Sequence, residues 1–187
     1  AVNVPWESTK DPQNPWHVAT PEQFAALMGQ AGVDGDTLVV VYDGAGLMRH
    51  GVRLWWTLAY YGHTSARVLN GGWQKWAAEG RPISLDVPQV ARASFVPRRD
   101  PSIFADARMV AGAIGKPGRL IWDVRSDGEW DGTTVRARRG GRIPSATHWE
   151  WAHSLRDTRA PTMKGAGELR RMFQERGITP DKEVLIY

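Results

Sequence analysis

The chain has no cysteine among its 187 residues, so it can form neither a disulfide nor a thiolate metal site. Long apolar runs are also missing, because none approaches the roughly 20 residues that span a bilayer. Histidine is sparse, and only His148 and His153 lie close together in the sequence. Their i, i+5 spacing differs from that of a helical metal-binding pair, so we expect no metal site and no cofactor.

The first residues, "AVNVPW", contain no methionine, no basic stretch and no apolar stretch, so they do not resemble a signal peptide. We therefore expect a cytoplasmic protein whose native N-terminus lies upstream of Ala1. The composition, with 42% hydrophobic and 24% charged residues, is ordinary for a globular protein. The length of 187 residues suffices for one large domain or two small ones.

The net charge is +4, and the stretch "VRARRGGRIP" gathers four arginines: Arg136, Arg138, Arg139 and Arg142. Such a stretch is either a solvated basic loop or a place that recognises an anion. Nucleic-acid binding is not expected, because neither a recognition helix nor an aromatic stacking platform accompanies the charge. A membrane partner is not expected either.

Tryptophan is abundant, with ten residues. Most lie inside apolar segments, which favours packing in the core over ligand binding. The tryptophans to which this expectation applies are Trp55, Trp56, Trp73, Trp76, Trp149 and Trp151.

The stretch "LVVVY" (38–42) has a counterpart in "EVLIY" (183–187), which defines an offset of 187 − 42 = 145 residues. The same offset pairs other similar residues without a gap, including Gly32 with Gly177 and Trp6 with Trp151. Such agreement is poorly explained by chance and indicates an internal repeat.

Each copy of the repeat predicts a helix, a short loop and a strand. In the first copy, Thr20 can cap a helix that has Pro21 at its first position, and Gln23 can close a capping box. The stretch "LVVVY" is an uninterrupted apolar run, typical of a parallel strand buried on both faces. Further helices are predicted at 50–61, 72–78 and 105–114, a short helix at "SDGEW", and further strands at 66–69 and 120–123. This alternation predicts an α/β fold of parallel sheets flanked by helices.

The offset also predicts how the chain divides. The second copy has a strand and loop (119–145) ahead of its matched region, and the first copy has residues 43–82 beyond its own. We therefore expect residues 1–85 to be the rear part of a first domain and residues 105–187 the front part of a second. Residues 86–104, rich in proline and arginine, are expected to be an inter-domain linker.

The stretches "VLNGG", "EGRP", "DVRS" and "GGRIPSATHWEW" together resemble the rhodanese (thiosulfate sulfurtransferase) family. The resemblance spans essentially the whole chain and implies two rhodanese-like domains, both partial here. In tandem members of this family the first domain is non-catalytic. The second carries a cysteine that takes a sulfane sulfur from thiosulfate or mercaptopyruvate and passes it to cyanide or a thiol through a persulfide.

The resemblance places the family's cysteine position at Asp43 in the first domain and directly after Tyr187 in the second. Asp43 cannot carry a sulfane sulfur, so we expect it to anchor its loop through backbone amides or through Arg53. The second position lies outside the sequence, so this chain should be inactive alone.

Two arginines are the candidate substrate-binding residues. Arg125 follows the predicted strand 120–123. Its alternative role is to form a structural ion pair with Asp123 or Glu150. Arg142 stands where many relatives have a histidine. Vertebrate members place a substrate-binding arginine at the position of Glu129, so the choice between thiosulfate and mercaptopyruvate stays open. The expected partners are a small anionic sulfur donor and a thiol or cyanide acceptor, and the oligomeric state is not predicted.

Two other interpretations remain. A non-catalytic rhodanese-like module that binds anions or partners would lack the second cysteine as well. A relative of the dual-specificity phosphatases would share the fold, but "VLNGG" and "EGRP" argue against it.

Overall fold

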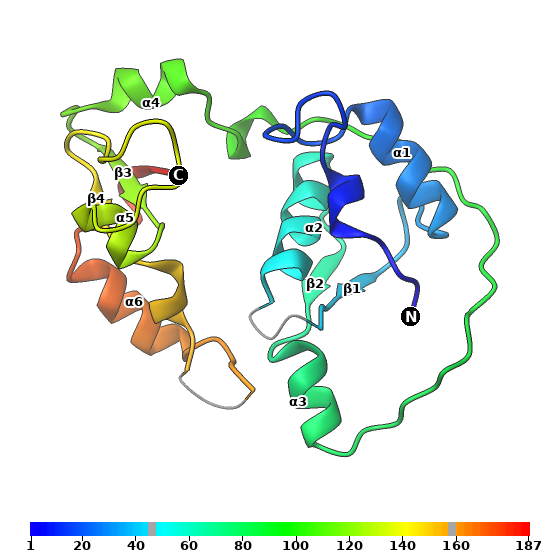
Figure 1. Cartoon of the computed structure of the whole chain (residues 1–187). Helices are drawn as coiled ribbons and strands as arrows, with labels where there is room; N and C mark the ends of the chain where they lie inside the picture. Colours follow the sequence, from blue (N-terminus) through cyan, green and yellow to red (C-terminus); the bar gives the residue numbers. More distant parts are fainter. Residues whose placement is uncertain (45–47, 157–159) are drawn as a thin grey trace. The chain divides into compact units, whose positions relative to one another are not determined.

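The computed structural model describes residues 1–44, 48–156 and 160–187. The chain forms two compact units, one built from Ala1–Phe104 and the other containing every helix and strand after Ala105 (Figure 1). Within the described residues, no helix combines the length and the apolar character that a membrane span requires.

The first unit holds a two-stranded parallel sheet with helices around it (Figure 1). Strand β1 pairs with β2 so that Val39 lies opposite Ala66. Its elements in chain order are η1 (Trp6–Thr9), α1 (Pro21–Gln30), β1 (Val39–Val41), α2 (Arg49–Tyr60), β2 (Ala66–Val68), α3 (Gly72–Ala78) and η2 (Pro101–Ile103).

Helix α1 shows how the sequence sets these elements. The predicted capping box is confirmed, since Thr20 Oγ1 accepts a hydrogen bond from the amide of Gln23 and the Gln23 side chain accepts one from the amide of Thr20. The helix buries Phe24 and Met28, four residues apart on one face, in the core of the unit. Phe24 stacks on the fully buried Tyr61, so the helix is fixed to the end of α2.

Segment 86–104 joins the two units and also lies against the first one. The amide of Ala93 donates to the carbonyl of Gly29, and that of Arg98 donates to the carbonyl of Tyr61. Phe95 is buried, and its ring packs nearly perpendicular to that of Phe24. A Cβ at Gly29 would lie 2.7 Å from the Ala93 carbonyl oxygen, so the glycine permits this close approach.

The second unit contains a three-stranded parallel sheet in the order β4-β3-β5. In this register Leu120 lies opposite Val184, and Asp123 lies opposite His148. Its elements are α4 (Ala107–Ala113), β3 (Arg119–Asp123), α5 (Asp127–Asp131), β4 (Thr147–His148), η3 (Trp151–Ser154), α6 (Ala166–Gln174) and β5 (Glu183–Ile186). Parallel strands and flanking helices in both units confirm the predicted fold class.

Stretches that match at the 145-residue offset have the same local structure. The 3-10 helices η1 and η3 begin at Trp6 and Trp151. Isolated antiparallel bridges join Lys10 with Val18 in the first unit and Leu155 with Met163 in the second. Helices α1 and α6 correspond, and the glycines that follow them, Gly32 and Gly177, both have positive φ. Similar sequence therefore folds similarly in both units.

The two sheets differ at one edge. In the second unit, β3 lies between β4 and β5. By the 145-residue offset, β4 corresponds to residues 2–3 of the first unit, and β5 corresponds to β1. Among the described residues of the first unit, β1 pairs with β2 alone. A cavity of about 590 Å³ lies there, lined by residues that include Val2, Val4, Val39 and Val41. Within the described residues, one backbone edge of β1 is therefore open.

The prediction that the tryptophans pack in the core is wrong for two of them. Trp149 is buried, but Trp55 and Trp73 are 38% and 37% exposed. On α2, successive side chains point about 100° apart, so Trp55 and Trp56 cannot both face the core. Trp56 takes the inner side, where it stacks on Tyr60.

Candidate functional site

The carboxyl end of β3 carries an ion pair in which the carboxylate is buried and the guanidinium is partly exposed. Asp123, the last residue of the strand, is fully buried. Arg125 folds back over it, with Nε 3.0 Å from Oδ1 and Nη2 2.6 Å from Oδ2. The backbone amide of Arg125 also donates to Asp123 Oδ1. This two-pronged geometry is the most favourable arrangement for an arginine and a carboxylate.

Tyr187 joins the end of β5 to the same pair. Its hydroxyl donates to Asp123 Oδ2 at 2.7 Å and accepts from the amide of Ile143 at 3.1 Å. The guanidinium of Arg125 lies 5.1 Å from the centre of its ring. The backbone of Tyr187 continues the hydrogen bonding between β5 and β3. Its amide donates to the carbonyl of Trp122, and its carbonyl accepts from the amide of Val124. Tyr187 is thus held at both its backbone and its side chain.

These contacts change the acidity of the groups. Burial opposes ionisation of Asp123, but hydrogen bonds from Arg125 and Tyr187 outweigh it, and the pKa of this carboxyl falls below its usual value. The hydrogen bond to Asp123 raises the pKa of Arg125. Burial, assisted by the neighbouring carboxylate, raises the pKa of the Tyr187 phenol. The site therefore holds a carboxylate, a guanidinium and a neutral phenol.

Arg142 lies in the exposed basic stretch and contacts an aromatic stack. Its Nη1 donates to the carbonyl of Trp130, and its guanidinium lies 4.3 Å from the centre of the Trp130 ring. Trp130 in turn stacks on His148. Arg125 reaches the same stretch, since its Nη2 donates to the carbonyl of Gly141. Both candidate arginines therefore position the loop that precedes β4.

The two arginines differ in what their charge can do. The positive charge of Arg125 is compensated by Asp123, one of the two structural ion pairs that the sequence allowed. The other possible partner, Glu150, accepts a hydrogen bond from the amide of Asp127. Arg142 is exposed and lines a cavity of about 560 Å³ together with Ile143, Pro144, Ile186 and Tyr187. The same cavity is lined by one basic residue, Arg142, and by one acidic residue, Asp106.

Other residues named from the sequence have structural contacts. Glu129 closes a capping box with Ser126 and lies 3.5 Å from Nε of Arg136. Arg136, Arg138 and Arg139 are exposed.

In the first unit, Asp43 follows β1 and its Oδ2 accepts from the amide of Gly51 in α2. Its carbonyl accepts from the amide of Trp73. Arg53 donates from Nε to Oγ1 of Thr9, and burial lowers the pKa of its guanidinium. Asp43 thus ties the end of β1 to two helices, while residues 45–47 of its loop lie outside the described residues.

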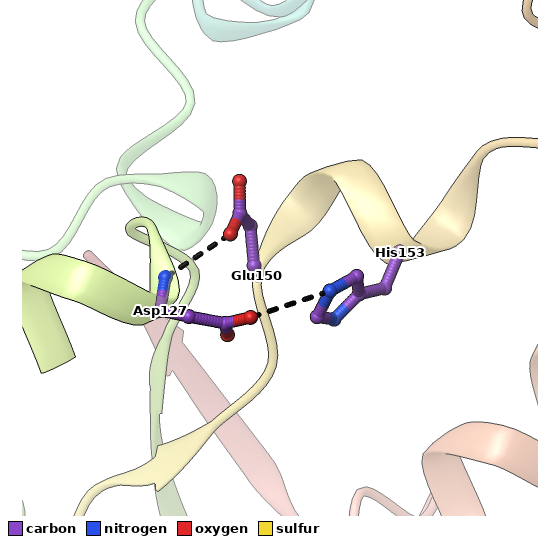
Figure 2. A group of neighbouring side chains, drawn as sticks. All are labelled: Asp127, Glu150 and His153. Carbon is purple, nitrogen blue, oxygen red and sulfur yellow. Dashed lines mark hydrogen bonds and ion pairs between the residues drawn. The ribbon is translucent and has the colours of Figure 1, made fainter. Parts of the chain in front are cut away.

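The structure also brings together a group that sequence reasoning missed. Asp127, Glu150 and His153 offer ligand atoms that all lie within 4.8 Å of one another (Figure 2). Asp127 begins α5, whereas Glu150 and His153 come from the segment after β4. No spacing rule joins these positions, because parallel pairing of β3 with β4 is what places the two segments side by side.

Residues 1–79 match the model of the rhodanese-like domain family. A relative from Haloferax volcanii, named among the thiosulfate sulfurtransferases, is 31% identical over 197 residues, with 100% of this chain and 67% of that protein covered. The chain belongs to the rhodanese family.

Two other relatives are more similar in sequence to this rhodanese-family chain. The sulfur carrier protein TtuD of Thermus thermophilus is 37% identical, with 89% of this chain and 61% of that protein covered. The thiosulfate sulfurtransferase of Azotobacter vinelandii is 34% identical, with 89% and 60% covered. The chain thus spans about three fifths of the length of these two relatives.

Solved structures share the fold of both units. An EanB variant in complex with hercynine gives a TM-score of 0.87 at 25% identity, covering 100% of this chain and 49% of that one. An EanB variant in complex with ergothioneine gives a TM-score of 0.86 at 26% identity, with the same coverage.

Proposed function

We propose that this chain belongs to a sulfurtransferase that moves a sulfane sulfur from thiosulfate or mercaptopyruvate to cyanide or a thiol. In this proposal the nucleophile is a cysteine directly after Tyr187, and the two units are tandem domains of which only the second is catalytic. The names of the relatives support sulfur transfer as the general activity.

One observation carries the proposal: Tyr187, which directly follows β5, lines the same cavity as Arg142. Because β3 and β5 are parallel, a residue after Tyr187 leaves the sheet at the edge where Asp123 and Arg125 lie. Ligand sites of α/β sheets lie at this carboxyl edge. A nearby guanidinium favours a thiolate over a thiol, and the thiolate is the nucleophilic form.

The proposed reaction has two balanced steps. The thiolate attacks the outer sulfur of thiosulfate and forms a new S–S bond with it. The S–S bond within thiosulfate breaks, and sulfite leaves with its electron pair. Cyanide then attacks the outer sulfur of the persulfide, giving thiocyanate and regenerating the thiolate. Covalent catalysis of this kind replaces one transfer by two easier ones.

We assign different roles to the candidate residues. Arg142 is assigned to the anionic donor, because this residue is exposed and lines the cavity that Tyr187 also lines. Arg125 is a positioning residue that acts through Asp123 and the carbonyl of Gly141. Asp43 occupies the nucleophile's place in the first unit and anchors the chain there through the amide of Gly51.

The test is to express a chain extended past Tyr187 and to assay thiocyanate formation from thiosulfate and cyanide. Activity and a mass increase of one sulfur on the residue after Tyr187 are expected, and both should vanish when that cysteine is changed to serine. Residues 1–187 alone serve as the inactive control. A residue other than cysteine after Tyr187, or a cysteine that never forms a persulfide, contradicts the proposal.

A non-catalytic module that binds anions or partners is the second candidate. Asp43 favours it, because the resemblance to the family assigns this residue to the nucleophile position of the first unit, and a carboxylate cannot carry a sulfane sulfur. It predicts that the extended chain binds thiosulfate in calorimetry without turning it over.

A further inference from the structure

One face of β1 is uncovered in the first unit, although the corresponding face of β5 is buried in the second. By the 145-residue offset, Val40 corresponds to Leu185. Val40 is 53% exposed, whereas Leu185 is 5% exposed and packs with Ala113 of α4 and Ile121 of β3. A helix and a strand therefore bury this position of the repeat in the second unit, and among the described residues of the first unit no equivalent pair covers it.

The backbone of β1 has a gap on the same side as the missing strand. Val39 and Val41 direct their polar backbone groups to β2 and the residues that flank it. Because these groups alternate along a strand, those of Val40 and Tyr42 face the open edge. The counterpart of Tyr42 in the second unit is Tyr187, whose amide donates to a carbonyl of β3. An open edge of this kind is a template for a further strand.

Two cavities adjoin β1, and the N-terminus of the chain lies beside them (Figure 1). The first, of about 590 Å³, is lined by residues 2–3 and by β1. Residues 2–3 correspond to β4, so this cavity holds the place that β3 occupies in the second unit. The second, of about 490 Å³, is lined by Val40, Tyr42 and Trp73 on the uncovered face. Ala1 lines both cavities.

Tyr42 indicates the chemistry of the strand that would fill the first cavity. Its hydroxyl has no hydrogen-bond partner within the described part of the chain, and the residue is 42% exposed. In the second unit the hydroxyl of Tyr187 donates at 2.7 Å to Oδ2 of Asp123, the last residue of β3. The repeat therefore points to an apolar strand that ends in a carboxylate.

We propose that β1 binds a helix followed by a strand, both from the part of the same polypeptide that precedes Ala1. The strand pairs in parallel with the open edge of β1 and ends in a carboxylate that accepts from the hydroxyl of Tyr42. The helix presents an apolar face, as α4 does, and covers Val40. Room for such a segment exists in the relatives from Thermus thermophilus and Azotobacter vinelandii, because the chain spans about three fifths of their length. The inference is independent of the proposed sulfur transfer, since these contacts do not involve the residue after Tyr187.

The first experiment compares amide hydrogen exchange, residue by residue, in two chains. One comprises residues 1–187, and the other runs from the native N-terminus of the polypeptide to Tyr187. The amides of Val40 and Tyr42 should exchange at least about tenfold more slowly in the longer chain. The amide of Val39, which already donates to Ser65, is the internal control and should change less. No added protection of Val40 and Tyr42 relative to Val39 would overturn the proposal.

The second experiment tests the contact at Tyr42. In the longer chain, Tyr42→Phe should raise the unfolding equilibrium constant of the first unit about fivefold, as the net loss of one hydrogen bond does. In residues 1–187 the same change should have no effect. Tyr187→Phe is the matched control, because its partner Asp123 is present in both chains and the loss should be equal in both.

Two outcomes would contradict this assignment. A silent Tyr42→Phe in the longer chain would overturn the carboxylate partner of Tyr42. Protection of β1 in residues 1–187 that rises with protein concentration would show that a second copy of the chain covers the edge in place of the preceding segment.

Discussion

The hydroxyl of Tyr187 donates a 2.7 Å hydrogen bond to Oδ2 of Asp123, a residue 64 positions earlier in the chain. The same hydroxyl accepts from the amide of Ile143, so one side chain ties together β5, β3 and the loop before β4. The carboxyl edge of the second sheet is therefore organised around one buried carboxylate.

The first prediction concerns Tyr187→Phe. This change removes a hydroxyl that both donates and accepts, and it leaves Asp123 with one fewer partner. We expect the free energy of unfolding to fall by about 1–3 kcal/mol in urea denaturation, the usual cost of unsatisfied buried groups. Tyr42→Phe is the control, because Tyr42 holds the corresponding place in the first unit and is 42% exposed. Equal losses in the two variants would contradict this role for Tyr187.

The second prediction concerns Asp123 and pH. The pKa of this carboxyl is lower in the folded state than the unfolded value of about 3.9, so the folded state favours its ionised form. Its contribution to stability is complete above that unfolded value and is lost as the pH falls through the folded pKa.

Asp123→Asn should therefore be less stable at pH 7 by about 3–5 kcal/mol, because it leaves the charge of Arg125 without its partner. The stability difference from wild type should narrow as urea denaturation is repeated from pH 5 down to pH 2. A difference that stays constant over this range would show that the carboxylate is not preferentially ionised in the folded protein.

The third prediction concerns the segment that joins the units. Phe95→Ala should destabilise the first unit by about 3–5 kcal/mol, because the ring is buried against Phe24. Its neighbour Val96 is 66% exposed, so Val96→Ala should change stability by less than about 0.5 kcal/mol. Thermal unfolding measures both, and rapid proteolysis of wild-type residues 90–98 under native conditions would argue against the packed arrangement.

The fourth prediction compares the two sheets. Strand β3 has partners on both sides, whereas within the described residues β1 has a partner on one side only. Alternate amides of β1 therefore face the open edge. Hydrogen exchange should be faster in residues 39–42 than in residues 120–123, by at least about tenfold for the most exposed amides. Equal protection of the two strands would mean that the edge of β1 is covered in solution.

Local chemistry made much of the fold readable in the sequence. Thr20, Pro21 and Gln23 specify a helix start through contacts within one turn, so α1 begins where the sequence predicts. Leu120, Ile121 and Trp122 form a short apolar run that likewise predicts β3, because a strand covered on both faces has no polar alternation. The burial of Trp55 and Trp73 was predicted wrongly, since apolar surroundings in the sequence do not fix which way a helical side chain points.

The sequence by itself determined the elements, the repeat and the family, because capping, apolar runs and similar residues at a constant offset are properties of the chain read in order. Tertiary structure decided the contacts of the candidate site. Arg125 could be paired with Asp123 or Glu150 on sequence grounds, and the fold chose Asp123 because the strand end turns the guanidinium back over it. The cluster of Asp127, Glu150 and His153 exists only because parallel strands end at the same edge of the sheet.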